Sequence, residues 1–330
     1  MSRTLIVVLL VFLSGCASVP REEALKLSTA GQKAAEASQA SLVDLANEVG
    51  GVTERNLVRF SVVKCKAQKG PSTPCEISTA PDEAVTQNEK LAGVISLRAR
   101  ALMQLHSAYG AFADEAKYDA QGDIDESLGQ LTDSVNALAG AMATLTGGST
   151  LAVIPVMKIA QKAAGESAKA AQKRRLLEAS QALQAIDRKL LELLREESAV
   201  YGNISDTLLS NRLQVADALL AAGILDPRPL VTDFAARNRM GALADIKAND
   251  PSVVAAARTI HAHQARRSAA ATRAAYASNI KAFEELIEQH DAFQAGQPVS
   301  LDGIAQALGE IRLWAELLKE LDDQGKEKQP

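Results

Sequence analysis

Apolar residues recur along most of the chain at intervals of three and four positions, the spacing that places them on one face of an α-helix. The longest unbroken stretch of this pattern lies between residues 124 and 145. Its apolar positions are Ile124, Leu128, Leu131, Val135, Leu138, Met142 and Leu145. Because these positions form a heptad pattern, they predict a helix that packs against another helix. A second heptad pattern spans residues 176–200 and predicts another such helix.

Glycine, proline and capping residues mark where the predicted helices begin and end. We expect one helix from near Pro81 to residue 146, with a kink at residues 122–123, and another from about Leu151 to Ala222. The glycine-rich residues 147–150 form the turn between them. The two helices therefore predict a long antiparallel hairpin, and each straight arm would approach ~100 Å at a rise of about 1.5 Å per residue.

Further helices are expected on both sides of this hairpin. Residues 19–41 are rich in alanine and polar side chains, which suits either a tether or an alanine-rich first helix. A shorter helix is expected over about residues 230–247. Asp250 and Pro251 are typical of a helix start and predict a long helix that ends near residue 295. The last helix is expected to begin at Ser300.

Two of these helices carry noteworthy residues in their apolar series. Arg98 interrupts the series of the helix that begins near Pro81, and we expect its charged group to reach water along its apolar stem. His290 ends the series Tyr276, Ile280, Phe283 and Ile287. We find no pair of histidines at the spacing that a helical zinc site requires, and the sequence predicts no metal site, no cofactor and no catalytic site.

The composition agrees with a helical fold. Hydrophobic residues make up 47% of the chain and aromatic residues only 3%, a mixture that suits long, closely packed helices rather than a β-sheet. We therefore predict an all-α protein, an elongated antiparallel helical bundle with a long coiled-coil-like helical hairpin. The predicted organisation is a leader over residues 1–15, an anchor and tether over 16–41, the bundle over 42–323 and a polar tail over 324–330.

The first residues have the pattern of an export signal. Arg3 precedes a short apolar segment over residues 5–13, which is too short to span a bilayer. The sequence Leu13-Ser14-Gly15-Cys16 follows and resembles the lipobox of bacterial lipoproteins, a resemblance that covers residues 1–18. It implies cleavage before Cys16 and acylation of that cysteine. Position 17 is alanine rather than aspartate, and the resemblance then implies the outer membrane, with the body of the protein in the periplasm.

The two other cysteines are consistent with an oxidising compartment. Cys65 and Cys75 flank the sequence Gly70-Pro71-Ser72-Thr73-Pro74, which is rich in turn-forming residues. A cysteine pair around such a turn in an exported protein predicts a disulfide. The spacing does not suit a zinc knuckle.

One apolar region and two basic stretches are candidate interaction sites. Residues 134–157 contain no charged side chain and include the predicted hairpin turn. The candidate contacts with a membrane or a partner in this apolar head are Leu145, Leu151, Val153, Ile154, Val156 and Met157. The head either packs into the bundle or a partner, or inserts into a membrane. The basic stretches lie at residues 169–175 and 258–273, where they either meet anionic groups or form solvated helix faces.

These observations predict a lipid-anchored cell-envelope protein with a structural or protein-interaction role and without catalysis. Its expected partners are the membrane, through lipidated Cys16, and another envelope protein. The net charge of −4 does not favour nucleic-acid binding. The alternative is a membrane-inserting or membrane-remodelling helical protein that uses the apolar head, an arrangement similar in architecture to α-helical pore-forming toxins.

Overall fold

The computed structural model of this protein describes residues 20–40, 42, 83–118, 121–147, 154–155, 159, 166–240 and 247–326. Residues 21–40 form the first of the described helices, which we call the N-terminal helix. The later helices are α3 (Glu83–Tyr118), α4 (Gln121–Thr146), α5 (Ala168–Ala221), α6 (Arg228–Arg237), α7 (Pro251–Gln294) and α8 (Asp302–Lys326). Within these ranges no residue belongs to a β-strand, and the all-α prediction is confirmed.

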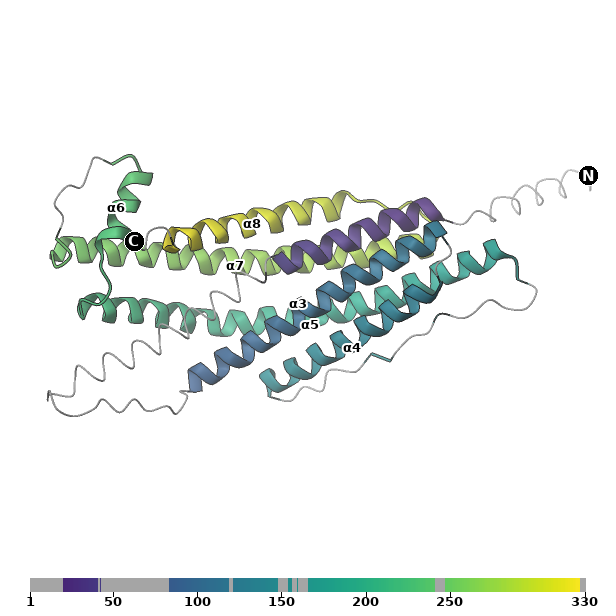
Figure 1. Cartoon of the computed structure of the whole chain (residues 1–330), viewed down its shortest axis with the longest axis horizontal. Helices are drawn as coiled ribbons and strands as arrows, with labels where there is room; N and C mark the ends of the chain where they lie inside the picture. Colours follow the sequence, from purple (N-terminus) through teal and green to yellow (C-terminus); the bar gives the residue numbers. More distant parts are fainter. Residues whose placement is uncertain are drawn as a thin grey trace, which may run out of the picture.

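Figure 1 shows an elongated bundle in which α3 and α4, α5 and α7, and α7 and α8 run in opposite directions, whereas α4 and α5 run in the same direction. Its longest helix, α5, has 54 residues and therefore extends for about 80 Å. The principal helix pairs are α3 with α4, α5 with α7, and α7 with α8. The N-terminal helix and α5 begin at one end of the bundle, which we call the Pro20 end, and α6 lies at the opposite end, the α6 end.

The interior is a continuous apolar core to which all the described helices except α6 contribute. The heptad positions from Ile124 to Met142 are each 2% exposed or less, so the apolar face predicted for this region is the one that is buried. A second, smaller cluster lies where α6 packs near the end of α5 and the start of α7. Its buried members are Leu220, Val231, Val253, Ala257 and Ile260.

The N-terminal helix is part of the bundle. Ala24, Leu27 and Ala34 have no exposed surface and belong to the main core. The folded bundle therefore begins at residue 21 rather than at the predicted residue 42, and residues 21–40 form a packed helix instead of part of the anchor and tether predicted over 16–41. The physical reason lies in the small side chains of this helix, which let it approach its neighbours closely enough to bury its alanines.

The connection between the two predicted hairpin arms differs from the expectation. The helix expected from Pro81 to residue 146 is divided into α3 and α4, which run in opposite directions and pack against each other. The turn at residue 147 follows α4, and Gly147 adopts a positive φ of 81°. Residues 154, 155 and 159 are not helical, and α5 begins only at Ala168. Pro155 disfavours helical backbone at the residue before it, so a helix could not run from Leu151 through this position.

Several predicted helix ends are confirmed. Asp250 caps α7 by accepting a hydrogen bond from the Ser252 backbone N–H, and Pro251 occupies the first turn. Gly223 and Gly296 follow the ends of α5 and α7 with φ values of 67° and 71°, which glycine adopts without a steric penalty. The short helix α6 covers residues 228–237 rather than the predicted 230–247.

Candidate functional site

The structure describes only part of the predicted apolar head. Cys16, Cys65, Cys75, Leu151, Val153, Val156 and Met157 lie outside the described residues. Leu145 is half-buried against the core, and Ile154 is 9% exposed and belongs to the core itself. The two head residues that are described therefore pack into the bundle. Within the described ranges, no helix is both long and apolar enough to cross a membrane.

Asn136 of α4 holds the segment around Ile154 against the bundle. Its Nδ2 donates to the Ile154 carbonyl at 3.0 Å, and its Oδ1 accepts from the Ile154 N–H at 2.9 Å. Farther along the same segment, the Ile159 N–H donates to Asp125 Oδ1 at 3.0 Å. Side chains of α4 thus replace the backbone hydrogen bonds that an extended segment lacks.

We expect Asn136→Ala to lower the free energy of unfolding by about 1–2 kcal/mol, because two backbone groups lose their partners. Urea unfolding followed by circular dichroism measures the change. Gln130→Ala, on the exposed face of the same helix, is the matched control and is expected to stay within about 0.5 kcal/mol of the unmodified protein. Equal stability of the two variants would show that Asn136 does not hold this segment.

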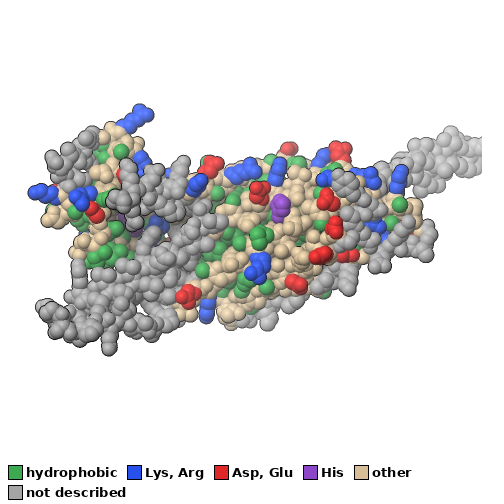
Figure 2. All heavy atoms as spheres, viewed as in Figure 1, with side chains coloured by type: hydrophobic (Ala, Val, Ile, Leu, Met, Phe, Trp, Pro, Cys, Tyr) green, Lys and Arg blue, Asp and Glu red, His purple; other side chains and the backbone are tan. Residues whose placement is uncertain are grey.

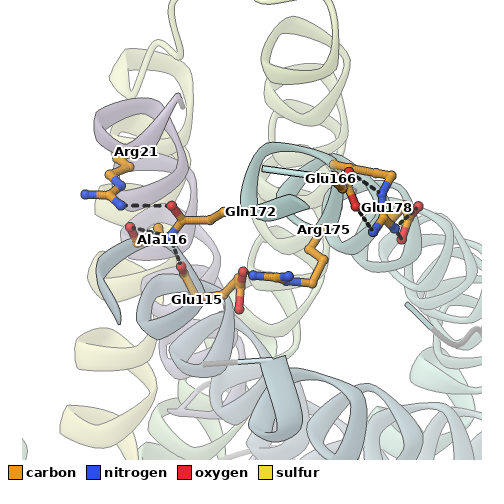
Figure 3. A network of polar contacts seen from close by, with 8 residues as sticks. Arg21, Glu115, Ala116, Glu166, Gln172, Arg175 and Glu178 are labelled. Carbon is orange, nitrogen blue, oxygen red and sulfur yellow. Dashed lines mark hydrogen bonds and ion pairs between the residues drawn. The ribbon is translucent and has the colours of Figure 1, made fainter. Parts of the chain in front are cut away.

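A network of polar contacts joins three helices at the Pro20 end (Figure 3). Arg21 Nη2 donates to Gln172 Oε1 at 2.8 Å, and Gln172 Nε2 donates to the Glu115 carbonyl at 2.7 Å. Arg175 Nε donates to Glu115 Oε1 at 2.9 Å, and both of these side chains are buried. We call Arg21, Glu115, Gln172 and Arg175 the end network. It connects the N-terminal helix, α3 and the first turns of α5.

The carboxyl group of Glu115 responds to two opposing influences. Burial raises its pKa, and the hydrogen bond and positive charge of Arg175 lower it, with the net result that the pKa is raised. The folded protein therefore holds a proton on Glu115 more strongly than the unfolded chain does. The corresponding stability is present below the unfolded-state pKa, about 4.3, and is lost as the pH rises through the folded-state pKa.

We expect the stability of the unmodified protein to fall, relative to that of Glu115→Gln, as the pH is raised from about 4 to about 8. The glutamine cannot ionise and so lacks this contribution. Urea unfolding at a series of pH values gives the difference between the two proteins. Glu178→Gln is the control, because Glu178 is a half-buried surface partner of Arg174. Parallel pH profiles for the unmodified protein and Glu115→Gln would contradict the predicted linkage.

The basic stretch at residues 169–175 is divided by its contacts. Arg174 lies 3.1 Å from both Glu166 and Glu178, and Arg175 belongs to the end network. Lys169 is exposed at the start of α5. In the second stretch, Arg258 pairs with Asp217 and Arg273 with Asp206. Arg174, Arg258 and Arg273 therefore lie beside acidic neighbours, Arg175 is buried, and Arg266 and Arg267 are exposed.

A second polar group lies in the interior of the bundle, and we call Tyr109, Ser180, Asp187 and His290 the central layer. The Tyr109 hydroxyl donates to Asp187 Oδ2 at 2.5 Å and lies 2.7 Å from His290 Nε2. His290 Nδ1 lies 2.8 Å from Ser180 Oγ. A neutral His290 carries its proton on Nε2 in this arrangement, because the Tyr109 proton is directed at Asp187. Burial raises the pKa of Tyr109 well above its usual value, and the negative charge of Asp187 acts in the same direction.

The central layer contains the residue types of a hydrolase triad, serine, histidine and aspartate, but these side chains are not accessible to solvent. Asp187, His290 and Ser180 each have no exposed surface. The Tyr109 hydroxyl lies between the histidine and the aspartate, whose Nε2 and Oδ2 atoms are 3.4 Å apart. The Ser180 hydroxyl therefore does not face solvent in the part of the chain that the structure describes. We therefore interpret the central layer as a buried polar contact that fixes the relative positions of α3, α5 and α7.

A third polar group consists of Arg98, Glu197 and Tyr276, and we call it the Arg98 layer. Arg98 Nη1 lies 2.8 Å from Glu197 Oε2, and both side chains are buried. The Tyr276 hydroxyl donates to Glu197 Oε1 at 2.6 Å, and the Arg98 guanidinium lies 5.3 Å from the centre of the Tyr276 ring. Arg98 is 7% exposed, so the expectation that its charge reaches water is wrong. Its charge is instead balanced by Glu197.

The sequence did not predict that the residues of the end network, the central layer and the Arg98 layer lie together. Its one indication of buried polar contacts is a polar residue within an apolar helical series, as at Arg98 and His290. Among the described residues, no group of three potential metal ligands lies together.

Comparisons of the chain with protein-family models, with curated proteins and with solved structures give no match.

Proposed function

We propose that this chain is a lipid-anchored protein of the bacterial cell envelope with a structural or protein-interaction role. The observation that carries the proposal is the sequence Leu13-Ser14-Gly15-Cys16 after a short apolar segment, immediately before a folded helical bundle. The proposed location is the outer membrane, with the bundle in the periplasm. Its partners are the membrane, through the lipid on Cys16, and an envelope protein.

The character of the bundle supports a structural role. Some of its ionisable side chains are paired across helices, and others belong to buried polar groups. The end network, the central layer and the Arg98 layer each connect helices that are far apart in the sequence. Buried polar contacts of this kind penalise alternative helix registers, because a shifted helix would leave buried charges without partners. A rigid rod of fixed register is suited to holding other components at a distance.

The second candidate function, which rests on the uncharged sequence of residues 134–157, is membrane insertion through the apolar head. Its described residues do not favour it, because Ile154 is buried and held by Asn136. The proposed disulfide between Cys65 and Cys75 is a further expectation for an exported chain, and it lies outside the described residues.

Lipidation gives the direct test of the proposal. We expect the unmodified protein, expressed with a lipoprotein-processing system, to incorporate labelled palmitate, and Cys16→Ser to incorporate none and to keep its leader. The variant with Cys65 and Cys75 both replaced by serine is the matched control, and it is expected to be labelled like the unmodified protein. Equal labelling of Cys16→Ser and the unmodified protein would refute a lipid anchor at this residue.

A further inference from the structure

The length of chain between the proposed anchor and the bundle is very short. Four residues, 17–20, separate Cys16 from Arg21, which is the first residue of the N-terminal helix. Five peptide units span at most about 18 Å when fully extended. The lipidated cysteine must therefore lie within that distance of the position at which the N-terminal helix begins.

The beginning of the N-terminal helix is fixed to the bundle at two points. Arg21 donates to Gln172 at the start of α5, as described for the end network. Glu23 Oε2 accepts a hydrogen bond of 2.6 Å from the Val299 N–H, in the connection between α7 and α8. Ala24 and Leu27 then have no exposed surface. Unwinding this helix to lengthen the tether would expose these apolar residues and break both contacts.

From this geometry we infer that the Pro20 end of the bundle contacts the phospholipid surface of the anchoring membrane and that the α6 end is held away from it. The inference rests on the proposed lipidation of Cys16 and adds an orientation and a contact surface to it. The two ends are separated by about the length of α5, which is about 80 Å at 1.5 Å per residue.

The two ends differ in their exposed apolar side chains, whereas exposed basic side chains occur at both. Arg21 and Lys169 are exposed at the Pro20 end, where they suit a layer of phosphate headgroups. The exposed large apolar residues of the described ranges include Ile224, Leu225 and Met240, which belong to the connections on either side of α6. Basic side chains are exposed at the α6 end as well, at Arg237, Arg239 and Lys247, so the orientation follows from the short connection to Cys16 and not from charge.

The charge of the bundle does not favour an orientation in which its long axis lies parallel to the membrane surface. On the face that Figure 2 shows, acidic and basic side chains are mixed along the bundle. The whole chain has a net charge of −4, and removal of residues 1–15 takes away Arg3, which leaves −5. A negatively charged rod is repelled by an anionic bilayer along its length.

Fluorescence quenching in vesicles tests the orientation. The lipidated protein, with Cys65 and Cys75 replaced by serine, is labelled at Gln297→Cys near the Pro20 end or at Arg237→Cys at the α6 end. Both native side chains are exposed. Vesicles of phosphatidylethanolamine and phosphatidylglycerol contain a lipid with a spin label on its headgroup. We expect quenching at position 297 to be several-fold stronger than at position 237.

A matched variant isolates the role of the short connection. Twenty glycine and serine residues inserted between Val19 and Pro20 are expected to reduce the quenching at position 297 to the level found at position 237. Equal quenching at both positions without the insertion, or quenching at neither, in protein that floats with the vesicles would overturn the orientation alone. Protein that does not float and whose Cys16 has an unmodified mass would overturn the proposed lipid anchor and the orientation with it.

Discussion

Replacing Arg98 with methionine is expected to lower the free energy of unfolding by about 3–5 kcal/mol. Methionine keeps much of the apolar stem but removes the charge, and Glu197 is left 1% exposed without a cation. The remaining partner of this carboxylate is the Tyr276 hydroxyl. One neutral hydrogen bond does not offset the cost of taking a carboxylate out of water. Urea unfolding followed by circular dichroism at neutral pH measures the loss.

Two further variants separate the buried charge from the arginine side chain itself. Arg195→Met removes an arginine of α5 from an exposed contact with Glu284 of α7. Exposed pairs contribute about 0–1 kcal/mol, so this variant is expected to be nearly as stable as the unmodified protein. Arg98→Met combined with Glu197→Gln removes both charges and keeps an acceptor for Tyr276, and it is expected to recover more than half of the loss. A mild effect of Arg98→Met, equal to that of Arg195→Met, would show that the Arg98 layer is not a buried ion pair.

The Arg98 layer also shows what the sequence could and could not reveal about the interior. The apolar series around Arg98 was visible in the sequence, and so was the interruption. The partner was not visible, because Glu197 lies on another helix and carries no local mark that distinguishes it from a surface glutamate. A lone arginine in an apolar series is most simply interpreted as a side chain that reaches water. Only the packing of α3 against α5 and α7 brings the two charges together.

Helix ends that depend on local chemistry were predicted well. The Asp250-Pro251 start of α7 follows from cap geometry that involves only a few neighbouring residues. The buried face of α4 also followed from its heptad pattern. The path of the chain after α4 was predicted wrongly. A heptad pattern indicates that a helix packs against another helix but does not identify that helix. Helix α4 packs against α3, which precedes it on the chain, and does not form one arm of a hairpin with α5.

The role of the N-terminal helix was left open by its composition. Alanine and polar residues suit both a solvated tether and a closely packed helix, and the difference depends on whether neighbouring helices offer a surface of matching shape. Gly31 shows that they do. A β-carbon added at this position would overlap the ring of Tyr109 on α3. The Ser28 hydroxyl donates to the Tyr109 carbonyl at 2.5 Å, which joins the same two helices.

Gly31→Ala is therefore expected to lower the free energy of unfolding by about 2–3 kcal/mol, although alanine is the better helix former. The added methyl group requires the Tyr109 ring or the N-terminal helix to move. The ring is fixed through its hydroxyl by Asp187 and His290 in the central layer. Gly140→Ala in α4 is the matched control, because nothing lies within 4 Å of the added carbon. That variant is expected to be more stable by about 0.5–1 kcal/mol, the usual gain of alanine over glycine in a helix.

A double-mutant cycle tests whether the central layer is what holds the ring in place. Tyr109→Phe removes the hydroxyl and its contacts with Asp187 and His290, so the ring gains freedom to shift away from an alanine at position 31. We expect Gly31→Ala to cost at least about 0.5 kcal/mol less in the Tyr109→Phe background than in the unmodified protein. An equal cost in both backgrounds would show that packing alone fixes the ring. A smaller cost would show that the hydrogen bonds of the central layer determine how closely the N-terminal helix, next to the proposed lipid anchor, can approach α3. The position of that helix would then be coupled to the buried polar contacts.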